Sequence, residues 1–446
     1  MTDIKLSDLP VVNSLQNSDI LPTVASGTTS KITVQDLAAT MPLVNSSSYA
    51  LTASYALNGG GGGGNAFPYT GSALITGSLG VTGSFSTTED IVVNTVTVGK
   101  GGGSVASNTA LGYSALRYNT TGRYNTAVGV CSLRCNTTGY ANTAVGSYAL
   151  GYNTSGYSNT ALGHLALVCN TTGFRNTAVG GAALFCNTYG IRNTAVGYYA
   201  LRFNTTGYNN TAIGYSAMLN NTSGIWNTAV GNCALSSNSY GSYNTAVGNF
   251  ALRSNTTGRY NVALGGAALG LNTSGGCNIA VGNYALQVNT YGCCNTAVGN
   301  RALFNNTIGC ANTAIGYSAL CWNATGFANT AVGNRALCLS FSGNRNTAIG
   351  AEALMYTENI KAVAIGYAAL RQNITGECNT AVGSSALRYN LYGHLNTAVG
   401  YYALLSNVSG NRNIALGAKA LYYNTGGECN IAIGVCALHQ NQTNYN

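Results

Sequence analysis

The chain has 446 residues, of which only 7% are charged and 59 are glycine. This composition differs from that of an ordinary globular enzyme and is typical of repetitive, tightly turned backbone. The net charge of +9 is the sum of −3 in residues 1–107, from three Lys and six acids, and +12 in residues 108–446, from fourteen Arg, two Lys and four Glu. Sixteen cations spread along the longer segment form a dilute stripe, so solvated charge is favoured over a nucleic-acid partner. No apolar run reaches the ~18 residues that cross a bilayer, so no membrane insertion is expected.

Residues 1–44 contain short apolar clusters separated by proline, a pattern typical of a small folded or partner-ordered module. The opening stretch MTDIKLSDLPVVNSLQ has no basic leader and no apolar segment of the kind found in signal peptides, so synthesis in a cytoplasm is expected. Residues 45–65 predict a linker, because Gly59–Gly64 is an uninterrupted glycine run. Residues 66–107 predict a neck of short β-rungs, since TGS recurs every six residues at Thr70, Thr76 and Thr82.

Residues 108–446 are built from a seventeen-residue repeat. The glycine that closes the motif NTAVG recurs every seventeen residues from Gly112 to Gly434, with a single step of sixteen between Gly350 and Gly366. We call each repeat a rung and number its positions from the Asn, so that NTAVGYYALRFNTTGYN, residues 193–209, holds positions 1 to 17. Over twenty rungs, position 3 is always Ala, position 5 always Gly, and position 4 always Val, Ile or Leu. Position 8 is otherwise Ala and position 9 otherwise Leu, the exceptions being Ser132 and Met218.

This pattern predicts an all-β fold, a parallel β-solenoid or β-roll of about twenty rungs. Seventeen residues with two glycines and no proline are too few for a helical-hairpin repeat. TAV and the stretch around AL are expected to form two short strands, with the glycines at the turns. Asn at positions 1 and 12 is expected to stack on its copies in amide ladders. Twenty rungs at ~4.8 Å give a rod roughly 95 Å long.

The expected core of each rung is the aliphatic residue at position 4, the Leu at position 9 and the small Ala residues. This core is thin, and a thin solenoid gains stability when several chains share one core. We therefore expect a homotrimer, with a single-chain solenoid as the alternative.

The variation between rungs is concentrated at positions 6, 7, 10, 11, 16 and 17. These positions hold all fourteen Cys, all three His and both Trp. They are rich in Tyr, Phe and Arg, whereas the repeats contain no Asp and only two Lys. Aromatic and Arg side chains carry most of the binding energy in recognition surfaces. The alternative is an unconstrained, solvated face. The candidate receptor-binding residues are Arg117, Tyr118, Arg134, Tyr152, Arg202, Phe203, Trp226, Arg253, Phe304, Trp322, Arg371, Arg388, Tyr389 and Tyr422.

Metal and catalytic chemistry find little support in the sequence. There is no CxxC motif, and the adjacent pair Cys293 and Cys294 has poor chelating geometry, so no metal site is expected. The three His lie rungs apart without an acid partner. Glu352 and Glu358 share the shortened rung, where a salt link to Lys361 is favoured over acid–base catalysis. The sequence therefore predicts no enzyme and no cofactor.

Stacking of rungs places several cysteines above one another. At a spacing near ~4.8 Å such pairs fall within disulfide range, but cytoplasmic assembly favours free thiols. The stacked pairs are Cys169 with Cys186, Cys277 with Cys294, Cys293 with Cys310, and Cys321 with Cys338.

The motif NTAVGxxAL resembles the SVAIGxxSxA repeats in the heads of trimeric autotransporter adhesins. That resemblance covers residues 108–446 and implies a trimeric, left-handed parallel β-roll, although the family's repeat is usually shorter. The chain shows no counterpart of that family's secretion signal, heptad stalk or membrane barrel. Surface display by that route is therefore not expected.

The N-terminal stretch KLSDLPVVNSLQNSDILPTVASGTTSKITVQDLAA is similar to the attachment segment of tailed-phage virion fibres. FPYTGSALITGSLGVTGSF and VGKGGGSVASNTALGYSAL resemble fibre proteins of aquatic phages. The resemblance implies that residues 1–44 attach to a tail or head protein of the virion and that the rod meets a host surface glycan or protein. It also implies assembly in the host cytoplasm. The alternatives are a non-binding structural spacer or capsid decoration, and ice binding through Thr ladders at positions 2 and 13.

Overall fold

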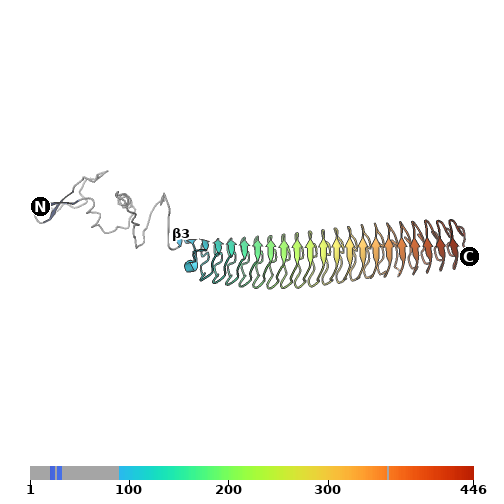
Figure 1. Cartoon of the computed structure of the whole chain (residues 1–446), viewed down its shortest axis with the longest axis horizontal. Helices are drawn as coiled ribbons and strands as arrows, with labels where there is room; N and C mark the ends of the chain where they lie inside the picture. Colours follow the sequence, from blue (N-terminus) through green and yellow to red (C-terminus); the bar gives the residue numbers. More distant parts are fainter. Residues whose placement is uncertain (1–20, 26–27, 33–89, 359–360, 446) are drawn as a thin grey trace. The chain divides into compact units, whose positions relative to one another are not determined.

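The computed structural model describes residues 21–25, 28–32, 90–358 and 361–445 (Figure 1). The chain divides into two compact units, Met1–Ser86 and Thr87–Asn446. In the first unit, β1 (Leu21–Ala25) and β2 (Thr28–Ile32) pair antiparallel. The rest of the predicted module 1–44, the predicted linker 45–65 and residues 66–89 of the predicted neck lie outside the described residues.

The described part of the second unit begins at residue 90 with an antiparallel hairpin. β3 (Ile91–Val93) pairs with β4 (Val96–Gly99), and β4 pairs antiparallel with β5 (Thr109–Gly112). A short 3-10 helix, η3 (Gly102–Ser104), connects β4 to β5. The carboxylate of Asp90 accepts hydrogen bonds from the backbone N–H groups of Lys100 and Gly101. The hairpin thus covers the first edge of the stack, which would otherwise expose unpaired backbone groups.

From β5 to β24 each rung contributes one strand, and all twenty strands are parallel and in register (Figure 1). We take residues 193–209 as the reference rung. In it, Ala195 lies opposite Ala178 of the preceding rung and Ala212 of the next rung. The shortened rung keeps the register, since Thr347 pairs with Val363. An all-β parallel solenoid of seventeen-residue rungs is therefore confirmed. The remaining strands are β6 (Thr126–Val128), β7 (Thr143–Val145), β8 (Thr160–Leu162), β9 (Thr177–Val179), β10 (Thr194–Val196), β11 (Thr211–Ile213), β12 (Thr228–Val230), β13 (Thr245–Val247), β14 (Val262–Leu264), β15 (Ile279–Val281), β16 (Thr296–Val298), β17 (Thr313–Ile315), β18 (Thr330–Val332), β19 (Thr347–Ile349), β20 (Val363–Ile365), β21 (Thr380–Val382), β22 (Thr397–Val399), β23 (Ile414–Leu416) and β24 (Ile431–Ile433).

The second strand expected around AL does not form in the described rungs. That stretch is a turn, in which Tyr199 and Leu201 of the reference rung have φ of 62° and 50°. Asn209, at position 17, also has a positive φ, of 55°. Such left-handed conformations are unfavourable for residues with a side chain. They persist because neighbouring rungs hold the backbone: the N–H of Leu201 donates to the carbonyl of Ala217 at 3.0 Å.

The core is narrower than expected. In the reference rung Ala195, Ala200 and Leu201 are fully buried, as predicted. The expectation that position 4 also belongs to the core is wrong for the single chain. Side chains alternate along a strand, so the inward Ala at position 3 turns positions 2 and 4 outward. The side chains of Ile213 and Val247 at position 4 are accordingly 41% and 38% exposed.

The predicted asparagine ladders are confirmed at both positions. The side-chain amide of Asn204, at position 12, donates to Oδ1 of Asn187 in the preceding rung at 2.8 Å and to the carbonyl of Gly207 at 3.0 Å. Asn193, at position 1, donates to the same carbonyl at 2.8 Å, and its Oδ1 accepts the backbone N–H of Asn210 at 3.0 Å. Each fully buried amide is therefore hydrogen-bonded both within its rung and to a neighbouring rung.

The two recurring glycines, at position 5 in all twenty rungs and at position 15 in eighteen, serve different needs. Gly197, at position 5, has φ of 133°, a conformation that side-chain-bearing residues rarely adopt. At position 15 the constraint on Gly207 is space, because a Cβ there would collide with Oδ1 of Asn204 and with the carbonyl of Gly224.

The shortened rung contains an ion pair different from the one expected. The carboxylate of Glu352 lies 2.6 Å from Nε of Arg371 in the next rung, where the sequence suggested a link to Lys361. Rung stacking, which places position 7 beside position 10 of the next rung, decides this pairing. Both side chains are about one quarter exposed, so the pair contributes little to stability.

Replacing one ladder asparagine tests the role of the amide columns. Asn255→Ala removes two bonds donated by its amide, to Asn238 Oδ1 and Gly258 O, and one donated to it by Asn272. We expect the free energy of unfolding to fall by roughly 2–4 kcal/mol, because buried polar groups lose their partners. Denaturant titration measures this, with Thr257→Ala at exposed position 14 as the control. A loss no larger than that of the control would contradict the assigned role.

Candidate recognition surface

The rung frame places the predicted receptor-binding residues at least partly on the surface. Except for Trp226 at position 17, they occupy positions 10 and 11, which follow the buried Leu of position 9. The exposed class contains Arg117, Tyr118, Tyr152, Phe203, Trp226, Arg253, Trp322 and Tyr389, and the half-buried class contains Arg134, Arg202, Phe304, Arg371, Arg388 and Tyr422.

Position 10 arginines lie over aromatic rings at positions 7 and 11. The guanidinium carbon of Arg202 lies 4.4 Å from the ring centre of Tyr199 and 4.9 Å from that of Phe203. Arg117 and Arg134 both lie over Tyr118, at 5.3 and 5.6 Å. These cation–π contacts fix long side chains that would otherwise lose conformational entropy on binding a ligand.

Trp226, Phe304 and Arg371 lie outside the clusters around Tyr118 and Tyr199, although Arg371 lies over the ring of Tyr356 and Arg301 over that of Phe304, both at 5.7 Å. Trp226 lies beside the start of a strand, at position 17. Phe304 packs edge-to-face on Tyr284, with 6.4 Å between ring centres, and Arg371 forms the ion pair with Glu352. Phe304 also contacts a buried cluster of Cys321, Cys338 and Met355. The contacts of Phe304 and Arg371 give these two residues a structural role.

The structure also reveals aromatic stacks that the sequence analysis did not single out. Tyr140, Tyr157 and Phe174, all at position 16, form a column with ring centres 4.9 and 4.6 Å apart and planes within 5°. Tyr243 and Tyr260 stack in the same way at position 17. The signal was present in the sequence as aromatic residues at one position in consecutive rungs.

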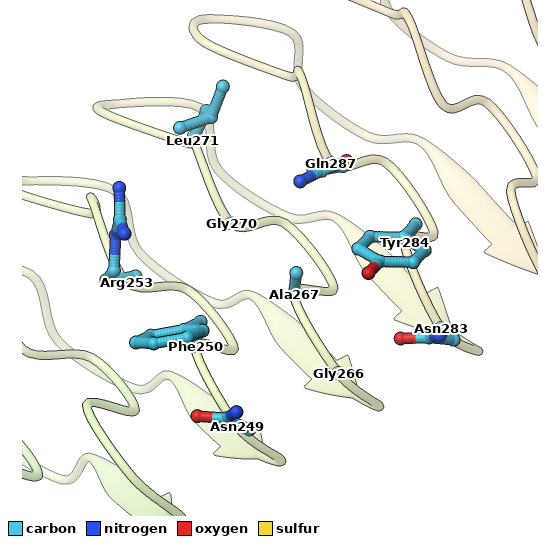
Figure 2. Close-up of a pocket in the computed structure, with 10 residues that line it drawn as sticks. All are labelled: Asn249, Phe250, Arg253, Gly266, Ala267, Gly270, Leu271, Asn283, Tyr284 and Gln287. Carbon is cyan, nitrogen blue, oxygen red and sulfur yellow. The ribbon is translucent and has the colours of Figure 1, made fainter.

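A hollow of about 350 Å³ opens beside the rung of Gly265. Its floor is formed by Gly266, Ala267 and Gly270, which occupy positions 6, 7 and 10 of that rung. Figure 2 shows Phe250 and Tyr284 on either side of Ala267. Of the lining residues, only Arg253 belongs to the predicted set, because that set consists of large side chains and the hollow arises from their absence. Its walls are completed by Asn249, Arg253, Leu271, Asn283 and Gln287.

The fourteen cysteines are free thiols, and rung stacking brings two of the predicted pairs into close contact. The Sγ atoms of Cys293 and Cys310 lie 2.9 Å apart, and the sulfur of Cys310 also accepts the backbone N–H of Cys293. The hydrogen bond to Cys310, together with burial, raises the pKa of Cys293 to about 12. In the buried pair, the hydrogen bond to Cys338 raises the pKa of Cys321. Neither Cys293 nor Cys321 has the lowered pKa of a nucleophile, whereas the hydrogen bond to Cys321 lowers the pKa of Cys338.

The described residues contain no group of three or more His, Cys, Asp or Glu placed to hold a metal ion. Within the same residues, no helix has the length and apolar character needed to cross a membrane.

Comparisons with family models, with curated proteins and with solved structures give no match for this chain.

The pKa of Cys293 leads to a test of its contact with Cys310. At pH 8.5 the Cys293 thiol should be almost entirely protonated, because its pKa is raised to about 12, and iodoacetamide should label it slowly. Cys310→Ala removes the hydrogen-bond partner, so the pKa should fall and labelling should accelerate. Peptide mass spectrometry follows the rate, and exposed Cys378 serves as an internal control. Equal labelling of Cys293 in both proteins would contradict the pairing.

Proposed function

We propose that the chain is a phage virion fibre that attaches to the particle through residues 1–44 and presents the rod to a receptor on the host cell. The receptor is a surface glycan or protein, and the docking partner is a tail or head protein. The particle is assembled in the host cytoplasm. The main support is the division of each rung into a constant, buried frame and a variable, outward set of Arg and aromatic side chains. Such side chains give large contact area at modest entropic cost.

We also propose that three chains assemble along the outward row of aliphatic residues at position 4. In the single chain each of these twenty residues is either half-buried or exposed, and none is fully buried. Together they form a continuous stripe down the strands. A stripe of this length is unusual on a monomer, because monomers rarely expose contiguous apolar patches of more than a few hundred Å². Burying it against other copies would supply the apolar core that each thin rung lacks.

The runner-up is a spacer or capsid decoration that binds no receptor. The contacts of Phe304 and Arg371 favour it locally, because these variable residues are used within the rod.

Ice binding is less favoured. At position 13 the hydroxyl of Thr205 donates to the carbonyl of Thr222 at 3.1 Å and is thereby occupied. At position 2, Val262, Ile279 and Val363 are among the residues that interrupt the other Thr row.

Self-association is tested by placing charge on the position 4 stripe. The triple variant Ile213→Asp, Val247→Asp and Val298→Asp should convert a three-chain species into single chains, because the carboxylates would have to be buried. Native mass spectrometry measures the change. The matched control is Thr206→Asp, Tyr240→Asp and Tyr291→Asp, at exposed position 14. A wild-type protein of one chain, or a triple variant that stays trimeric, would remove the trimer from the proposal.

Receptor binding is tested with the full chain coupled to beads and incubated with a panel of bacterial strains. We expect adsorption to at least one strain, and a loss of roughly tenfold or more in the Arg202→Ala, Phe203→Ala variant, because clustered Arg and aromatic residues dominate such interfaces. Thr206→Ala, from the same rung, is the control. Absence of adsorption to every strain would favour the spacer.

A further inference from the structure

The hollow beside the rung of Gly265 differs from its surroundings by a local absence of side chains. The rung of Gly265 is the one among the twenty in which none of positions 6, 7 and 10 carries a side chain larger than a methyl group. The frame itself is unchanged, since Ala267 N–H donates to Asn249 O at 2.8 Å and Tyr284 N–H donates to Gly266 O at 2.9 Å. The result is a slot one rung wide, between two rungs that carry full side chains (Figure 2).

The end walls of the slot are the rings of Phe250 and Tyr284, at position 7 of the flanking rungs. Both side chains are 38% exposed, so each ring has surface available to a ligand. Both are also held by neighbours: the guanidinium carbon of Arg253 lies 5.5 Å from the ring centre of Phe250, and Phe304 packs edge-to-face on Tyr284. The walls are therefore preorganised, which lowers the entropic cost of binding.

The width of the slot suits one saturated six-membered ring. Equivalent atoms two rungs apart are separated by roughly 9.6 Å, which accommodates one ring, and not two, at carbon–carbon contacts of about 3.5–4.0 Å with each wall. The volume of about 350 Å³ is at the lower end of ligand pockets.

The polar groups around the slot suit a ring that carries hydroxyl groups. Asn249, Asn283 and Gln287 each offer an amide donor and an amide acceptor, and Arg253 adds donors. Oδ1 of Asn283 lies close to Gly266: a Cβ atom on Gly266 would be 2.6 Å from this oxygen. Hydroxyl groups both donate and accept, so such a mixed set matches them better than it matches a purely apolar ring.

We propose that this slot binds a single pyranose residue of a glycan, held between Phe250 and Tyr284 with its hydroxyl groups on the surrounding amides. The proposal rests on the receptor-binding role proposed above and names the class of ligand at one place on the rod. Arg253 is the one charged residue among those that line the slot, so uronic acids are accepted as well as neutral sugars.

Titration of the full chain with maltotriose, chitotriose, galactotriose and trigalacturonate tests the proposal, with saturation-transfer NMR as the readout. We expect saturable binding of at least one of these trisaccharides and ring signals from a single sugar residue. Ala267→Tyr should abolish it by filling the slot, because position 7 accepts Tyr at residue 199 with a similar backbone conformation. Phe250→Ala and Tyr284→Ala should each weaken it at least tenfold. Ser114→Tyr and Tyr148→Ala, also at position 7 but far along the rod, should have no effect.

Wild-type protein that binds none of the four sugars up to about 10 mM would overturn the proposal, since weaker binding carries less than about 3 kcal/mol. Sugar binding that survives Ala267→Tyr would also overturn it, as would a slot that binds indole and no sugar. The cell-adsorption assay separates this failure from failure of the fibre itself. Adsorption retained by Ala267→Tyr removes only the slot from the receptor site, whereas a wild-type chain that binds sugar and adsorbs to no strain removes the proposed receptor function.

Discussion

The structure depends on the in-register stacking of identical backbone from rung to rung. Each rung donates and accepts its hydrogen bonds through its neighbours, and the asparagine columns at positions 1 and 12 repeat this with side chains. Because most rungs make the same contacts with the next, a conformation that is costly in isolation is stabilised along the stack. Leu201 in a left-handed turn is one example, with its N–H bonded to the next rung and its side chain fully buried.

This arrangement separates folding from surface chemistry. At position 7 the backbone has nearly the same φ whether the residue is Tyr199, at 62°, or Ala267, at 53°. In both cases the N–H bonds to a carbonyl of the preceding rung, so the side chain contributes little to the path of the chain. Position 7 can therefore change without disturbing the frame, and a rung with small residues there becomes a slot. A frame with this property suits a molecule whose surface must vary.

Position 4 is an exception to this separation of a constant, buried frame from a variable surface. Its residue is always Val, Ile or Leu, yet it faces outward in the single chain. A constant aliphatic row that the rung does not bury needs a cause outside the rung. Burial against further copies of the chain, as proposed above, would supply such a cause.

The number of rungs, the period, the parallel stacking and the asparagine columns could all be predicted from the sequence. Each follows from residues that recur at a fixed interval and have one satisfactory place in a repeating backbone. The sequence also located the variable positions. It did not determine which faces of the rung point inward: TAV reads equally well with its aliphatic residue in or out, and AL looks like a strand until the left-handed turn at Leu201 is seen. The partner of Glu352 and the slot above Ala267 likewise depended on the tertiary structure, since both arise between side chains of neighbouring rungs.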